Sequence, residues 1–433
     1  MSNRLHFRDE GLGAALRELH VPPHRPGFEQ ELGELLAREQ RPRRWTQLRP
    51  RGLAAAAAAL AAVAVVFAVT RLASSPALAS RVQAKAAAAF ANGRTMRGVI
   101  VWRSQFGQRE VSRWSFAMTA RGDLRATALD GSADSVYLAS TGVLRGLNAS
   151  SALGSAHRFA SVVTGVPPGP PDGGPAQDEF IQRRLGAVVR VLVAADDPRV
   201  RTTVFEGRKA WRVALPTQPN RAYADYDRLD VTIDQKTGIV LRAVYTLHGK
   251  FRSELRVVRF AVDRPLPPKT FRLVFPRGEE VLRSDEGFRR VPLRRAASTV
   301  GYAPLVPHSV PAGYRLADVA VARKPANAAQ LDEEPPSRDV VSLSYRRGFD
   351  EFLVTTRRRG SGTWRDPLRP PQGSTGHPQR VRLHGGALDG ITAELDVDLR
   401  TTPHLWALTP TLVVTVSGDL ARDELLAVAQ SLR

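Results

Sequence analysis

The spacing of hydrophobic residues changes several times along the chain, and the longest uninterrupted apolar stretch predicts a membrane span. Residues 53–69 read LAAAAAALAAVAVVFAV and contain no charge, proline or glycine. A helix rises about 1.5 Å per residue, so this stretch covers roughly 25 Å, near the lower limit for crossing a bilayer. We expect a single transmembrane helix over residues 53–70. A buried soluble helix and a signal-peptide core remain alternatives, although a start so far into the chain disfavours a signal peptide.

Basic residues are distributed unevenly around this stretch, and their distribution predicts the orientation of the span. Six arginines precede it within fifteen residues, whereas Arg71 is the one that closely follows. The preceding ones are Arg38, Arg41, Arg43, Arg44, Arg49 and Arg51. Because positive charge is retained on the cytoplasmic side, we expect the N-terminus in the cytoplasm and most of the chain outside it. The expected location is the inner, or cytoplasmic, membrane.

The tail of residues 1–52 has two short stretches with helical spacing of apolar residues. A helix-breaking HVPPHRPG segment separates them, and each helix alone is marginal in water. Two apolar stripes without a core favour docking to a partner protein or to the membrane surface, although a ligand-free helical hairpin or a partly disordered tail fits equally. The candidate partner-binding residues are Leu16, Leu19, Phe28, Leu32 and Leu35.

After the span, a helix is predicted that carries Val82, Ala86 and Phe90 on one side and ends at Asn92-Gly93. The apolar spacing then changes to two, which is typical of strands with one buried face. A second helix is expected over residues 180–195, and further strands continue to about residue 285. These elements predict a long, strongly curved antiparallel sheet with helices against its inner face, occupying residues 77–285.

A second, smaller α+β domain is expected over residues 295–433. Its strands include a hairpin that turns at Gly348, and a closing helix runs from Leu420 to Leu432. In that helix, Leu425, Val428, Ala429 and Leu432 share one face. Asp419 is placed to cap its start. The predicted fold class is therefore α+β, with one transmembrane helix, a curved half-barrel with helices and the smaller C-terminal domain.

The composition changes this picture little. The net charge is +21, from 63 Lys and Arg against 42 Asp and Glu, and nearly all of the positive charge is arginine. Scattered arginine together with abundant alanine, glycine and proline is typical of high-GC coding sequence, which would explain the positive charge. The alternative explanation is that the positive charge attracts an anionic partner. No nucleic-acid motif accompanies the basic residues, so we expect no nucleic-acid partner.

Residues that could carry out catalysis form no recognisable motif. The absence of cysteine excludes disulfides, thiolate metal sites and cysteine nucleophiles. None of the nine histidines lies in an HExxH motif, and the spacing of His20 and His24 is interrupted by Pro22-Pro23. We expect no metal site, no cofactor and no enzymatic activity.

Three stretches of the predicted half-barrel carry a family resemblance: the opening helix with GVIVWRSQ, the hairpin LDVTIDQKTGIVLRAV and the closing PPKTFRLVFPRGEEV. They resemble the LolA-like fold of lipoprotein carriers and of the N-terminal domain of RseB/MucB-type proteins, and Phe271, Pro276 and Gly278 fit the family's closing strand. The C-terminal region resembles the second domain of RseB-like proteins through Pro311, Gly313 and Tyr314, a Leu405-Trp406 strand and the closing helix.

The resemblance implies an apolar cavity between sheet and helices that holds lipid or acyl chains. The residues that would line it are Ile100, Trp102, Phe106, Trp114, Phe116 and Trp211. A core filled by these side chains is the alternative. The implied function is a membrane-anchored extracytoplasmic binding or sensory protein of the bacterial envelope that regulates a sigma or anti-sigma system. Its implied partners are a lipid, lipoprotein or envelope protein outside and a sigma-factor-like or other protein at the tail. A tethered lipid or lipoprotein carrier is the alternative function.

Overall fold

The structure is a computed structural model, and it describes most of the chain beyond residue 75. The described residues are 76–106, 108–148, 153–158, 181–215, 227–285, 287–323, 339–359, 364, 366, 368, 378–397 and 402–433. They belong to one compact unit that comprises residues 70–433. Within this described part, no helix has the length and apolar character needed to cross a membrane. The predicted tail and span, residues 1–70, lie outside the described residues and stay predictions.

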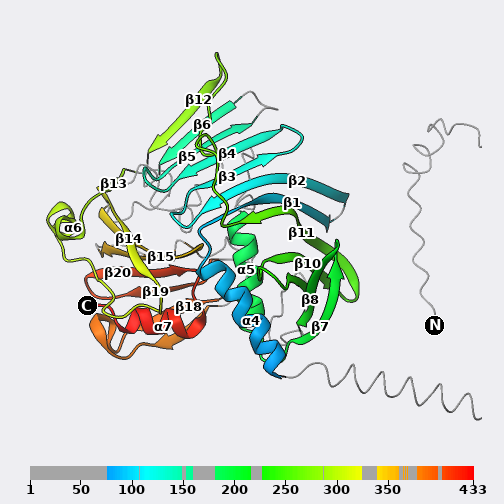
Figure 1. Cartoon of the computed structure of the whole chain (residues 1–433). Coiled ribbons are helices and arrows are strands. Elements are labelled where there is room, and N and C mark those ends of the chain that lie inside the picture. The colour runs from blue at the N-terminus through cyan, green and yellow to red at the C-terminus, as the bar shows by residue number, and fades with distance from the viewer. Residues whose placement is uncertain are drawn as a thin grey trace, which may run out of the picture. The chain divides into compact units, whose positions relative to one another are not determined.

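In the described residues, twelve strands form sheet 1, which is strongly curved (Figure 1). Its strands are β1 (Thr95–Phe106), β2 (Gln108–Thr119), β3 (Leu124–Ala128), β4 (Ala133–Leu138), β5 (Val143–Asn148), β6 (Leu153–Arg158), β7 (Arg199–Phe205), β8 (Arg208–Leu215), β9 (Arg228–Asp234), β10 (Val240–Leu247), β11 (Lys250–Val262) and β12 (Glu280–Asp285). The order across the sheet is β12-β6-β5-β4-β3-β2-β1-β11-β10-β9-β8-β7. The predicted α+β class with curved sheets is confirmed.

The closing segment of sheet 1 differs from its prediction. A strand was expected within residues 267–281, but the chain there forms turns, and β12 begins only at Glu280. Pro267, Pro268 and Pro276 have no N–H to donate to a neighbouring strand, and Pro267 and Pro276 instead accept turn hydrogen bonds from Thr270 and Glu279, so β12 starts only after these turns. β12 then pairs in parallel with β6, so the expectation of an entirely antiparallel sheet is wrong at this pair.

Two helices cover part of one face of sheet 1, as predicted. In α4 (Pro76–Ala91), Val82, Ala86 and Phe90 recur at helical spacing and are buried. In α5 (Ile181–Val193), the side chains buried in the same core are Leu185, Val188 and Leu192. The two helices contact each other, and the Gln83 side chain of α4 donates to the backbone carbonyl of Leu192 at 2.9 Å. This hydrogen bond adds a partner to a carbonyl in the last turn of α5, which otherwise accepts only a long bond from the Ala195 N–H at 3.4 Å.

Eight strands of the described chain form sheet 2 beside three helical elements. The strands are β13 (Phe288–Arg290), β14 (Arg315–Arg323), β15 (Asp339–Arg347), β16 (Asp350–Arg358), β17 (Gln379–Arg382), β18 (Thr392–Asp396), β19 (His404–Leu408) and β20 (Leu412–Gly418), in the order β13-β14-β15-β16-β20-β19-β18-β17. The helical elements are α6 (Leu293–Val300), the 3-10 turn η4 (Gly386–Leu388) and α7 (Arg422–Gln430). The hairpin at Gly348 and the closing helix are as predicted, and the domain limits of 77–285 and 295–433 stay proposals.

Asp419 does not cap α7, contrary to its prediction. The capping position is Ala421, whose N–H donates to the Glu424 carboxylate at 2.9 Å. The Asp419 carboxylate instead pairs with Arg190 of α5 and accepts from the Glu351 N–H at 3.2 Å. Asp419 lies two residues too early for the cap, and an arginine guanidinium is a stronger partner for its charge. It therefore links sheet 2 to a helix of sheet 1.

The turn between β15 and β16 inserts into the core of sheet 1. Phe349 is 2% exposed and belongs to the hydrophobic cluster formed by α4, α5 and sheet 1. Its N–H donates to the Phe90 carbonyl at 2.9 Å, and the two rings meet edge to face with centroids 6.0 Å apart. Gly348 has φ +57°, and a Cβ there would collide with the Phe90 carbonyl. Only glycine allows the turn to approach α4 this closely.

Replacing Phe349 with alanine should lower the free energy of unfolding by about 3–5 kcal/mol, because it opens a cavity in the core of sheet 1. Urea denaturation of the full chain in detergent measures this loss. Phe251→Ala is the matched control, because Phe251 is 36% exposed at the β10–β11 hairpin. This replacement should lower the free energy of unfolding much less. Equal losses in the two variants would contradict the insertion.

Candidate functional site

The burial of the helix-covered face of sheet 1 declines along β1 and β2. On β1, Met96 and Ile100 are 0% and 3% exposed, but Trp102 is half-buried. On β2, Phe116 is buried, while Trp114, which pairs with Ile100, is again half-buried. The packed core therefore gives way to partly exposed aromatic side chains toward the hairpin that joins these strands.

A third aromatic side chain, Tyr245 of β10, completes this region. Its ring centroid lies 6.3 Å from that of Trp102, and it too is half-buried against the core. Trp102 and Trp114 are diagonal neighbours on one face, because Trp102 pairs with Ser112. We refer to Trp102, Trp114 and Tyr245 as the aromatic margin. Large apolar rings at the edge of a packed core suit contact with an apolar chain.

The predicted cavity residues are divided between the core and this margin. Ile100, Phe116 and Trp211 are 3%, 5% and 6% exposed and help to fill the packed core. Trp102 and Trp114 lie at the aromatic margin. Phe106 ends β1, and its side chain lies outside the described part. Trp211 belongs to β8, separated from β1 by three strands, so it is not adjacent to the margin. The cavity assignment stays a prediction.

Sequence reasoning missed Tyr245, although a signal for it was present. Tyr245 alternates with Ala243, which pairs with Leu255 on the helix-covered face, and period two places both on that face. The tail residues Leu16, Leu19, Phe28, Leu32 and Leu35 lie outside the described residues, so their role stays a prediction as well.

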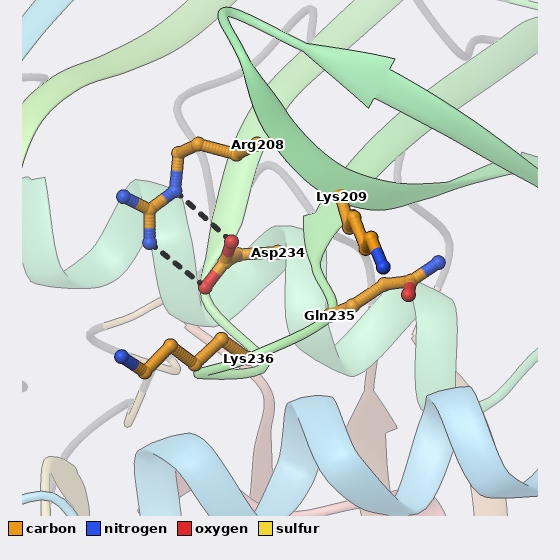
Figure 2. A pocket seen from close by; sticks show the side chains of 5 residues that line it. All are labelled: Arg208, Lys209, Asp234, Gln235 and Lys236. Carbon is orange, nitrogen blue, oxygen red and sulfur yellow. Dashed lines mark hydrogen bonds and ion pairs between the residues drawn. The ribbon is translucent and has the colours of Figure 1, made fainter.

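A pocket of about 490 Å³ lies where β8 meets the β9–β10 turn (Figure 2). Its lining consists of Arg208, Lys209, Asp234, Gln235 and Lys236. Three of these five side chains are cationic. The pocket contains none of the residues predicted to bind a ligand, because no motif marks it in the sequence.

Asp234 is the fixed centre of this pocket. It is 2% exposed and accepts from Arg208 Nε at 3.0 Å and from the Thr237 hydroxyl at 2.6 Å. Burial alone raises the pKa of Asp234, but the hydrogen bonds from Arg208 and Thr237 outweigh it, so the pKa lies below its ordinary value. Asp234 is therefore ionised at neutral pH, and its charge is matched by Arg208.

A second buried polar pair joins His404 of β19 to Asp366. His404 Nε2 lies 2.6 Å from the Asp366 carboxylate, and Nδ1 lies 2.7 Å from the Thr402 carbonyl. Both neighbours are acceptors, so both ring nitrogens donate and the ring is an imidazolium. Burial alone lowers the pKa of His404, but the bond to Asp366 and its charge outweigh it, so the pKa is raised. The 1% exposure of the ring gives this pair a structural role.

Among the described residues, no three histidine or acidic side chains gather in a way that could hold a metal ion.

No protein-family model matches the chain, and no curated protein matches its sequence. A chain of the Pseudomonas aeruginosa MucA/MucB complex is similar in structure, with 16% identity, a TM-score of 0.31 and coverage of 82% of this chain and 98% of that chain. LprF from Mycobacterium bovis matches with 14% identity, a TM-score of 0.29 and coverage of 46% and 99%. A LolA superfamily protein from Nitrosomonas europaea matches with 12% identity, a TM-score of 0.20 and coverage of 45% and 97%.

The predicted resemblance to LolA-like and MucB-type proteins is confirmed as a resemblance, because the structural matches fall among the same proteins. The matches do not extend to a membrane anchor.

The His404–Asp366 pair predicts a pH-dependent stability. A raised pKa means that the folded state binds the proton more tightly, so the pair contributes fully below about pH 6.5. This contribution is lost as the pH rises through the raised pKa of the folded state. The melting temperature of the native chain should therefore exceed that of His404→Gln most at low pH, and the gap should narrow as the pH rises. His384→Gln, at an exposed position, is the control and should show no such trend.

Proposed function

We propose that the chain is an extracytoplasmic binding protein of the bacterial envelope that takes the acyl chain of a lipid or lipoprotein at the aromatic margin. The observation that carries this proposal is the step in burial between Ile100, which is fully packed, and Trp102 and Trp114 beside it, which are only partly buried. Rings left partly in water at the edge of a continuous core gain free energy when an apolar chain covers them.

Neutral aromatic side chains favour an acyl group over a charged ligand at this place. Trp102, Trp114 and Tyr245 have no ionised group, and Trp102 and Tyr245 already contact each other. The next residues on this face, Leu255 opposite Trp102 and Ala243 beside it, are apolar and buried. An apolar chain that entered between these rings would thus continue the existing core.

Among functions for such a binding protein, we favour sensing over carriage. The Phe349 insertion and the Arg190–Asp419 pair connect sheet 2 to the core of sheet 1. A ligand that shifts the packing of sheet 1 would therefore act on sheet 2 through these contacts. With the predicted span and tail, this coupling supports a sensor that regulates a sigma or anti-sigma system. A tethered lipid or lipoprotein carrier, which needs no coupling, is the alternative.

The acyl-binding proposal is tested by contact quenching of tryptophan fluorescence with 9,10-dibromostearate, using the full chain held in amphipol. Bromine quenches only nearby indoles, so Trp102→Phe/Trp114→Phe should remove most of the quenching. The control, Trp406→Phe, changes a buried ring in sheet 2 and should leave the quenching intact. Quenching that survives in the Trp102/Trp114 variant would exclude the aromatic margin as the site.

The sensing part of the proposal predicts a partner for the tail. The full chain in membranes should bind a sigma factor or an anti-sigma protein, and Leu32→Asp/Leu35→Asp should abolish the binding by placing charge on the apolar stripe. Co-purification from crosslinked cells measures this, with Glu31→Gln as a control at an adjacent polar position. If the native chain bound neither class of protein, the carrier function would replace sensing.

A further inference from the structure

Two carboxylates lie close together where sheet 2 reaches the core of sheet 1. Asp350 begins β16, and Asp419 follows β20. The Asp419 carboxylate accepts from the Glu351 N–H at 3.2 Å, and this N–H belongs to the peptide bond between Asp350 and Glu351. The Glu351 carboxylate itself pairs with Arg346 at 3.1 Å. Asp350 and Asp419 are therefore close neighbours, and only 14% and 15% of their side chains are exposed.

Each of these carboxylates has an arginine partner, and the two arginines come from different parts of the fold. Asp419 pairs with Arg190 of α5, a helix that packs into the core of sheet 1. Asp350 accepts from Arg347 of β15, from Nη2 at 3.0 Å and from Nε at 3.3 Å. The Asp419–Arg190 pair thus connects the two sheets, whereas the Asp350–Arg347 pair lies within sheet 2.

The other ionisable groups around Asp350 add no positive charge. The Tyr314 hydroxyl donates to the Asp419 carbonyl at 2.7 Å, and burial raises the pKa of Tyr314 far above its ordinary value, so this ring stays neutral. The Arg347 guanidinium lies 4.3 Å from the centre of the same ring. Glu424 of α7 is near enough for its charge to act on Arg347. Three carboxylates therefore face two guanidinium groups when Asp350 is ionised.

Burial and this crowding of negative charge make the ionised form of Asp350 unfavourable. Burial is the larger cause and the charge of Asp419 the second, and together they raise the pKa of Asp350 to about 7 against the opposing effect of Arg347 and Arg190. An aspartate in water has a pKa of about 3.9. If the β15–β16 turn withdraws from sheet 1, Asp350 enters water and moves away from Asp419. Withdrawal of the turn therefore releases a proton, and its insertion takes one up.

We propose that Asp350 makes the contact between the two sheets sensitive to pH: a proton on Asp350 keeps the β15–β16 turn inserted beside α4, and loss of this proton favours its withdrawal. Asp350 directly follows Phe349, whose ring fills the core of sheet 1, so its charge acts on the insertion itself. The contribution is complete below about pH 3.9 and is lost as the pH rises through about 7. None of these groups belongs to the aromatic margin, so this regulation is separate from acyl binding.

Hydrogen exchange of the full chain in detergent tests the proposal at the Phe349 N–H, which is bonded to the Phe90 carbonyl and exchanges when the turn withdraws. Its protection factor, corrected for the intrinsic exchange rate at each pH, should fall at least tenfold between about pH 5.5 and pH 8. Asp350→Asn is neutral and similar in size, so it should keep the high protection at both pH values. Asp423→Asn is the matched control, because it removes a carboxylate whose side chain is 93% exposed on α7, and it should keep the native trend.

Two further variants separate withdrawal of the turn from other causes. His404→Gln removes the other buried pair that responds to pH and should leave the trend at Phe349 in place. Asp350→Ser is a second neutral replacement, which gives the result if Asp350→Asn does not fold. The proposal is overturned by equal protection at both pH values in the native chain, by a native trend in the neutral variants, or by loss of the trend in His404→Gln. No acyl chain is present in these measurements, so such a failure leaves the proposed acyl binding untouched.

Discussion

The fold depends on how two helices cover one face of a very wide sheet. Twelve strands spaced about 4.8 Å apart span more than 50 Å, whereas two helices, each about 10 Å across, cover less than half of that width. The remaining part of the face must find other cover or remain in water. Curvature brings the two sides of the sheet toward α4 and α5, and Phe349 fills a further gap. The aromatic margin lies where this cover ends.

The elements of the fold could largely be predicted from local sequence patterns. The period of two through Ile100 and Trp102, and the helical spacing of Val82, Ala86 and Phe90, depend only on one face being buried. The closing segment resembles a family strand in sequence, but turns at Pro267 and Pro276 take the place of strand pairing there. The role of Asp419 could not be predicted, because its partner Arg190 is 229 positions away in the chain.

The candidate sites show the same division between local and distant information. Trp102 and Trp114 could be selected because aromatic alternation is visible in the sequence, but their partial burial depends on what distant segments pack against them. The His404–Asp366 pair and the pocket of Lys209 and Lys236 unite residues from separate segments, neither of which carries a motif. The sequence shows arginines scattered along the chain, and no pattern in it indicates that Lys209 of β8 and Lys236 of the β9–β10 turn line one pocket.

The Gly348–Phe349 turn has a consequence for the order in which the chain acquires its structure during synthesis. Domains generally fold from the N-terminus as the ribosome proceeds. Here the core of sheet 1 includes a ring that is made only after every strand of that sheet has been translated. The place beside Phe90 that Phe349 occupies in the folded chain therefore cannot be filled by this ring until the β15–β16 turn is made. Sheet 1 reaches its final packing only when the β15–β16 hairpin has formed, so the last step in folding the first half of the molecule belongs to the second half.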